Sequence, residues 1–447
     1  MRFLRHCSLL PILLLLVPAV LAAQTKRLLS LDSALQLADV QSLDVRSAQL
    51  ALERTSRQMG VLDEEWLPSL SADADYQFNI QRPVLFIAPG NPFNTGENMQ
   101  AFPIGSRHAT ALSINGRLPL YNPRVGLQRR LASAQIALSQ AQLEGARALV
   151  RQQTERAFYR ALYSRAARDT RDSQIGRAQE NLAFTLSRFR QGRSLALDTL
   201  TATASLARSR ADAERARYDY LGSLFQLAQL LDINDYRNLE VTGELTVPAA
   251  PGPTGGDLST GRVNGAEARV AEAERGAAAV AADVEGRDFY PTIDAVGRWQ
   301  ALGQSADMLP TDWSAAMVSF VGVTASLPIS NLWRGDARVE EARARVAEAE
   351  LRILKLRRED SIEVETLLLS MQGARAQISA EEATVTEARR AVQITLVLYR
   401  EGRATWLDVE TAQSRLLEAE LAVKRATLEF LMNYADLKAL AGPDDGE

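Results

Sequence analysis

The sequence Phe189-Arg190-Gln191-Gly192-Arg193 recurs as Tyr399-Arg400-Glu401-Gly402-Arg403, at an offset of 210 positions (399 − 189). Residues 189–206 and 399–416 agree at 8 of 18 positions, whereas chance gives about one or two at average residue usage. In both copies Leu and Asp follow the glycine at the same distance, as Leu197-Asp198 and Leu407-Asp408. The chain is therefore an internal repeat built around two matching turns.

Long stretches without proline flank both turns. No proline lies between Pro123 and Pro248 or between Pro328 and Pro443, and these tracts are rich in Ala, Leu, Arg, Glu and Gln. Those residue types favour helix. Apolar and small residues are spaced alternately by three and four, as in Val409, Ala412, Leu416, Ala419, Val423, Ala426 and Phe430. This spacing predicts coiled-coil helices, one of them over about residues 124–187 and roughly 95 Å long.

The two glycines mark the points where the predicted helices turn back. Gly192 and Gly402 are suited to the left-handed conformation that ends many helices. Asp198 and Asp408 follow six residues later, at the start of each returning helix. Thr405-Trp406-Leu407-Asp408 resembles a capping box with Asp in place of Glu. A capping role and a functional role for Asp408 can coexist.

Four segments alternate apolar and polar residues with a period of two, which predicts strands. They lie at about residues 67–80, 108–120, 291–302 and 315–328. Each has the length that a tilted strand needs to cross a bilayer. A soluble half-buried sheet fits the local pattern equally well, but two hairpins embedded between very long helices favour the membrane interpretation. Residues 81–107 contain several Pro and Gly and are expected to form a long loop at an extracellular rim.

Composition and the N-terminus exclude several classes of protein. The formal net charge of −4 gives no electrostatic reason to expect a nucleic-acid partner. One Cys and two His leave no Cys/His zinc site, no Cys–His nucleophile pair and no disulfide framework. We therefore expect no enzyme, no catalytic residue, no metal and no cofactor. Residues 1–22 read as a cleaved secretory signal; Cys7 precedes the apolar run, so we expect no lipoprotein.

The expected fold class is mainly α with a transmembrane β portion, arranged as two tandem repeats. The first repeat spans residues 23–246 and the second 265–441, with a linker at 247–264 and a tail at 442–447. Each repeat reads as helix, β-hairpin, long helix, tight turn and long helix. Four strands cannot close a membrane barrel, and open sheet edges are not tolerated in lipid. The sequence therefore predicts an obligate oligomer whose barrel is shared between chains.

With these features the chain resembles the TolC-type outer-membrane efflux protein family. The resemblance rests on the [Phe/Tyr]-Arg-x-Gly-Arg turn followed by Leu-Asp in both halves, on the strand-ending Leu118-Pro119-Leu120 and Leu327-Pro328-Ile329, and on the two-fold organisation. It implies a homotrimer with a twelve-stranded barrel in outer-membrane lipid and an α-helical tunnel through the periplasm. It also implies partners: a periplasmic adaptor protein and an inner-membrane pump of RND, ABC or MFS type. Drug efflux and polypeptide secretion remain open.

The resemblance also assigns roles at the periplasmic tip. It implies that three copies of Asp408 form an acidic pore constriction, and that Asp198, Tyr399 and Arg403 latch the hairpins. Close carboxylates would raise one another's pKa values and favour cations, and we expect Asp408→Asn to raise conductance. Some family members carry a second acidic residue and a basic one where this chain has Thr411 and Ala404. The alternative is a periplasmic coiled-coil adaptor or scaffold without a pore.

Overall fold

The computed structural model describes residues 27–90, 92–248, 265–287, 290–306, 314–329 and 331–441. The predicted signal peptide, most of the predicted linker and the predicted tail lie outside the described residues. The chain forms two compact units, one made of residues up to Ala38 with Gln153–Val247 and Ala374–Met432, the other of the remaining segments. Each unit takes segments from both sequence repeats.

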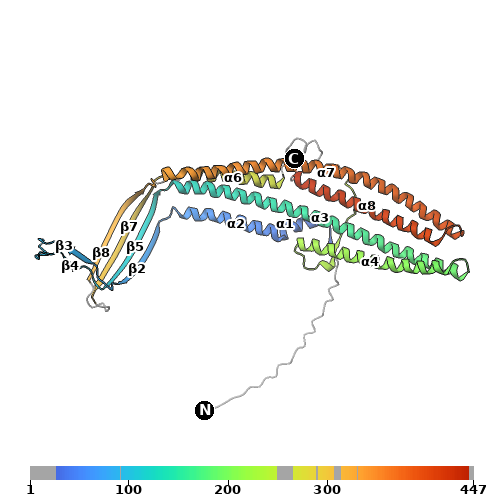
Figure 1. The fold of residues 1–447 in the computed structure, drawn as a ribbon, viewed down its shortest axis with the longest axis horizontal. Helices are drawn as coiled ribbons and strands as arrows, with labels where there is room; N and C mark the ends of the chain where they lie inside the picture. Colours follow the sequence, from blue (N-terminus) through green and yellow to red (C-terminus); the bar gives the residue numbers. More distant parts are fainter. Residues whose placement is uncertain are drawn as a thin grey trace, which may run out of the picture. The chain divides into compact units, whose positions relative to one another are not determined.

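One unit contains a four-stranded antiparallel sheet (Figure 1). Its strands are β2 (Ser69–Phe78), β5 (His108–Tyr121), β7 (Thr292–Ser305) and β8 (Ser314–Ser326), in the order β2-β5-β7-β8. All four coincide with the segments predicted from the period of two. The two predicted hairpins, β2–β5 and β7–β8, join through antiparallel pairing of β5 with β7.

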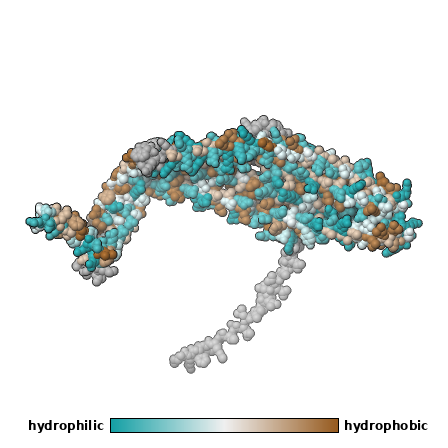
Figure 2. All heavy atoms as spheres, viewed as in Figure 1, coloured by the Kyte–Doolittle hydropathy of each residue, from teal (hydrophilic) through white to brown (hydrophobic). Residues whose placement is uncertain are grey.

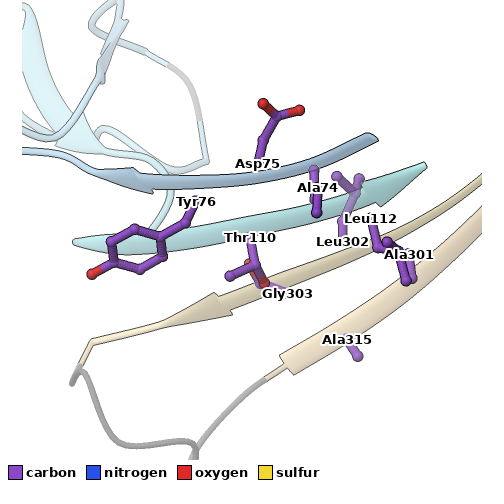
Figure 3. A pocket seen from close by; sticks show the side chains of 10 residues that line it. Ala74, Asp75, Tyr76, Thr110, Leu112, Ala301, Leu302, Gly303 and Ala315 are labelled. Carbon is purple, nitrogen blue, oxygen red and sulfur yellow. The ribbon is translucent and has the colours of Figure 1, made fainter. Parts of the chain in front are cut away.

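The register of the sheet places the apolar and polar residues on opposite faces. Ala74 pairs with Leu112, Leu112 with Ala301, and Ala301 with Met317, so these four share one face. Figure 3 shows this face where small side chains leave a shallow depression, with Asp75 pointing to the side opposite Ala74. Successive side chains alternate across a strand, so the predicted apolar and polar faces are confirmed.

The long loop expected over residues 81–107 contains secondary structure that the sequence did not indicate. The segment contains β3 (Val84–Ile87) and β4 (Gln100–Pro103), which pair antiparallel as a separate two-stranded sheet. Its four-residue strands are too short to produce a clear alternation, and Val84-Leu85-Phe86-Ile87 is apolar at every position. Within these two strands the only proline is Pro103, which ends β4, and the end of a strand tolerates proline.

Helices α2 (Leu43–Glu64) and α6 (Ala266–Glu285) lie in the same unit as the sheet, with the first parts of α3 (Pro123–Arg190) and α7 (Asn331–Arg400). Helix α3 starts at a proline, whose fixed φ and missing N–H suit the first helical position. Ion pairs link α6 to its neighbours: Arg269–Glu144, Arg352–Glu274 and Arg357–Glu272. They are largely exposed, so each contributes little to stability.

The other unit contains the ends of α3 and α7 with the returning helices α4 (Ala196–Leu230) and α8 (Trp406–Ala441), which continues beyond this unit at its C-terminus. It begins with α1 (Leu31–Gln41) and a parallel pair that the sequence analysis did not predict, β1 (Arg27–Leu29) with β6 (Leu239–Val241). A short 3₁₀ turn, η1 (Tyr236–Asn238), precedes β6. The small sheet is stabilised by buried Leu29 and Val241.

Candidate functional site

The two glycine turns end α3 and α7 with the same hydrogen bonds. The Gly192 amide donates to the Phe189 carbonyl at 2.9 Å, and the Arg193 amide donates to the Arg188 carbonyl at 2.9 Å. In α7 the Gly402 and Arg403 amides make the matching bonds at 3.1 and 2.8 Å. The two glycines have φ of +70° and +76°. These are Schellman motifs, as the repeated glycines predict.

Asp408 closes the capping box at the start of α8. Its Oδ2 accepts from the Thr405 amide at 2.8 Å and from Thr405 Oγ1 at 2.7 Å, while the Asp408 amide donates to Thr405 Oγ1 at 3.3 Å. The side-chain and backbone hydrogen bonds from Thr405 hold the pKa of Asp408 below its ordinary value. Within one chain, capping therefore favours the charged form of Asp408; the raised pKa expected for three close copies stays a prediction.

Asp198 and Tyr399 are connected through Ser194. The Ser194 hydroxyl donates to Asp198 Oδ2 at 2.7 Å, and its oxygen lies 3.4 Å from the Tyr399 hydroxyl. Since the single Ser194 proton points at the carboxylate, Tyr399 is the donor in the second contact. The predicted partners thus lie together within one chain, where this link joins the start of α4 to the end of α7.

Arg188 is a tip residue that the sequence analysis missed. Its Nη1 donates to the carbonyl oxygens of Tyr399 and Arg400 at 2.9 and 2.7 Å, and its Nη2 donates to the Arg193 carbonyl at 3.3 Å. These carbonyls belong to helix C-termini, whose partial negative charge favours a cation. The sequence feature that could have indicated Arg188 is a difference between the repeats, since position 188 carries Arg and the matching position 398 carries Leu.

An aromatic cluster fills the tip between the two helical hairpins. Tyr399 and Trp406 are buried, and their rings lie 5.6 Å apart at 62°. Phe184 packs edge-on against Tyr399 at 6.1 Å, and the Arg188 guanidinium carbon lies 5.1 Å from the Tyr399 ring centroid. Edge-to-face and cation–π contacts of this kind add to the energy of burial. With Ala202 and Val409 they form a core that draws on all four helices.

Arg403 and the apolar residues of the α3–α4 turn face outward. The Arg403 side chain is 73% exposed and pairs with Glu401 at 3.6 Å, so in this chain it latches nothing beyond its own turn. Figure 2 shows apolar surface at the free end of the helical hairpins. Its exposed residues on the α3–α4 side are Phe189, Leu195, Leu197 and Leu200.

The polar face of the sheet carries a network of hydrogen bonds between strands. Asn115 donates to Asp73 at 2.8 Å and accepts from Arg298 at 2.6 Å. Arg117 forms an ion pair with Asp294 at 2.5 Å. The opposite face exposes large apolar side chains, which are Leu70, Tyr76, Leu112, Ile114, Met317, Val321 and Val323. An exposed apolar surface of this kind marks a site of contact with another protein or with a membrane.

No group of three or more His, Cys, Asp or Glu side chains among the described residues is arranged to hold a metal ion. Among the helices of the described segments, none combines the length and apolar character that crossing a membrane requires.

Residues 34–232 and 262–443 match the family model described as outer membrane efflux protein. The chain belongs to this family. The two matched segments are separated by residues 233–261. A curated relative is the outer membrane efflux protein BepC of Brucella suis biovar 1 (strain 1330), 23% identical over 241 residues, or 54% of this chain. The match spans 50% of the length of BepC.

Solved structures of outer-membrane channels share the fold of this outer membrane efflux protein. The Campylobacter jejuni CmeC channel superposes with a TM-score of 0.71 at 17% identity, covering 92% of this chain and 85% of CmeC. VceC of Vibrio cholerae gives 0.69 at 18% identity, covering 92% and 96%. The open-state MtrE channel of Neisseria gonorrhoeae gives 0.66 at 18%, covering 92% and 89%. These similarities establish the fold.

Proposed function

We propose that this chain is the outer-membrane channel component of a tripartite efflux or type I secretion system. In this role it is a passive exit duct across the periplasm and outer membrane. The observation that carries the proposal is the sheet, with one exposed apolar face, one hydrogen-bonded polar face, and strands long enough to cross a bilayer at a tilt. Lipid covers the first face and water fills the lumen along the second.

The sheet edges support an oligomeric barrel. Strands β2 and β8 are the two edges of the described sheet, and they run antiparallel to each other through β5 and β7. Edge β8 of one copy can therefore pair with edge β2 of the next and continue the alternation. Closed membrane barrels start at about eight strands. We propose a homotrimer, whose twelve strands also leave a water-filled lumen.

The tip supplies the gate in this proposal. Three copies of Asp408 surround the axis, and their negative charges select cations as acidic rings do in other channels. Thr405 keeps each carboxylate charged by its hydrogen bonds. Tyr399, Ser194 and Asp198 hold the two hairpins of each copy together. Arg403 is exposed and would latch only against a neighbouring copy.

The proposed partners and location follow from the family. A periplasmic adaptor docks at the tip and joins the duct to an inner-membrane pump of RND, ABC or MFS type. In this proposal the chain is exported through a cleaved signal peptide and resides in the outer membrane with a long periplasmic extension. The alternative, an adaptor or scaffold without a pore, leaves the apolar face of the sheet without a role.

Single-channel recording in a planar bilayer tests the proposal. Wild-type protein should give small cation-selective steps, and Asp408→Asn should give larger, less selective ones because the acidic ring is lost. Asp44→Asn is the matched control, since Asp44 is also an exposed acidic residue in the first turn of a helix. Inserted, oligomeric protein without any conductance would count against the duct. Equal effects of both substitutions on conductance would mean that Asp408 does not form the gate.

A further inference from the structure

The β3–β4 hairpin is an ordered element at the end of the sheet that lies away from the helices (Figure 1). The Ile104 amide donates to the Pro83 carbonyl at 2.8 Å and closes its base. Its turn is organised by Asn94, which is 1% exposed. The Asn94 amide nitrogen donates to the carbonyls of Ile87 and Asn98 at 2.7 and 2.9 Å. The hairpin therefore presents a defined surface.

Both faces of this hairpin are apolar and exposed. Leu85 pairs with Phe102, so these two residues share one face, whereas Val84 and Phe86 lie on the other. The exposed fractions are 50% for Leu85, 37% for Phe102, 45% for Val84 and 62% for Phe86. A two-stranded hairpin has no core of its own and is marginal in water. We therefore expect each of the two apolar faces to be buried against another surface.

A second copy of the chain fits this requirement better than lipid. An anionic lipid headgroup is met by basic side chains, but the only charged residue in 83–104 is Glu97. In a cyclic oligomer each copy has one neighbour on either side, and the hairpin begins just after β2, the strand at an open sheet edge. A ring thus supplies two covers, one for each face, and continues the contact between sheet edges.

We propose that the hairpins of adjacent copies pack against one another in a ring at the outer mouth of the barrel. The face of Leu85 and Phe102 in one copy meets the face of Val84 and Phe86 in the next. This inference rests on the proposed oligomeric duct and adds a second narrow point besides the proposed Asp408 ring. Each contact removes apolar side chains from water, which favours the association.

Cysteine cross-linking tests the ring. The sole native cysteine, Cys7, lies in the predicted signal peptide, so the mature chain provides a background free of thiols. Phe86→Cys with Phe102→Cys places one thiol on each face, and the two point apart within a chain and cannot pair. On oxidation the double variant should lose most of its monomer band to dimer and closed trimer. Each single variant, the matched control, should stay monomeric on the same non-reducing gel.

Sedimentation of the same detergent-solubilised samples separates the two hypotheses. Trimers that sediment normally but show no cross-link in the double variant overturn the hairpin ring and leave the duct intact. A monomer by sedimentation overturns both. Cross-linking in a single variant as strong as in the double variant would mean that like faces meet, which contradicts a ring. Replacing residues 84–103 by a short Gly-Ser bridge in the Asp408→Asn background should raise the conductance further; an unchanged conductance contradicts the second narrow point.

Discussion

Replacing Arg188 by leucine should loosen the tip of the helical hairpins while leaving the rest of the chain folded. Leucine is the residue that the second repeat carries at the matching position, 398. The change removes hydrogen bonds of 2.9 and 2.7 Å to the last carbonyls of α7 and the cation–π contact with Tyr399. The Tyr399 carbonyl would keep its bond from the Gly402 amide, whereas the Arg400 carbonyl would lose the donor that Arg188 provides.

The magnitude follows from the contacts that Arg188 makes. Buried charge-assisted hydrogen bonds contribute about 1.5–3 kcal/mol each. Arg188 is only half-buried, so we take about 1 kcal/mol for each of the two shorter bonds and about 0.5–1 kcal/mol for the cation–π contact. The free energy of local opening should therefore fall by about 2.5–3 kcal/mol, which is about a 70- to 160-fold change in the opening equilibrium.

Amide hydrogen exchange measures this opening directly, because exchange of protected amides reports local unfolding. Peptides covering residues 186–200 and 396–408 should exchange faster in Arg188→Leu by that factor. Peptides covering 239–241, which lie in the same unit but in the β1–β6 pair, should not change. Arg190→Leu is the matched control, since Arg190 is an exposed arginine in the last turn of the same helix. Exchange at the tip that is equal in both variants would refute the role of Arg188.

Two further predictions concern backbone conformation and charge. Gly402→Ala should lower the free energy of unfolding by about 1 kcal/mol, because φ is +76° there. Gly176→Ala, inside α3 with open space around it, should raise the free energy of unfolding by about 0.5–1 kcal/mol. Denaturant titrations in which both substitutions change this free energy in the same direction would contradict the left-handed turn at Gly402. Burial raises the pKa of Asp360 above its ordinary 3.8, and Glu267 and other nearby carboxylates raise it further. The ionised carboxylate therefore destabilises the folded state at neutral pH. This cost disappears below the pKa of Asp360 in the unfolded chain, where the group is protonated in both states. Asp360→Asn should therefore raise the denaturant midpoint at pH 7 and lose this advantage below pH 3.8, unlike the exposed control Asp219→Asn; a gain independent of pH would exclude the carboxylate as its cause.

The features that sequence reasoning predicted correctly are governed by neighbours along the chain. Gly192 and Gly402 end helices because the left-handed conformation is inexpensive for glycine. Asp408 caps α8 because its partner, Thr405, lies three residues away. The four long strands were readable because an amphipathic sheet repeats its pattern over ten or more residues. The β3–β4 hairpin was missed because four uniformly apolar residues have no period.

The candidate site was only partly visible in the sequence. Asp198, Tyr399 and Arg403 were named from a family resemblance, but the structure places Ser194 between the first two and leaves Arg403 at the surface. Arg188 was missed because its acceptors, the Tyr399 and Arg400 carbonyls, lie more than two hundred residues away. No local rule identifies such a partner, because helix packing alone brings the two turns together.

By itself the sequence determined the repeat, the long helices, their two turns and the amphipathic strands, since each depends on residue type and short-range spacing. Only the tertiary structure decided which strands pair in which order, that β1 pairs with β6 across more than two hundred residues, and that one arginine joins two helix ends. These contacts depend on long-range packing: many pairings satisfy the same local pattern, and burial of the shared core selects among them.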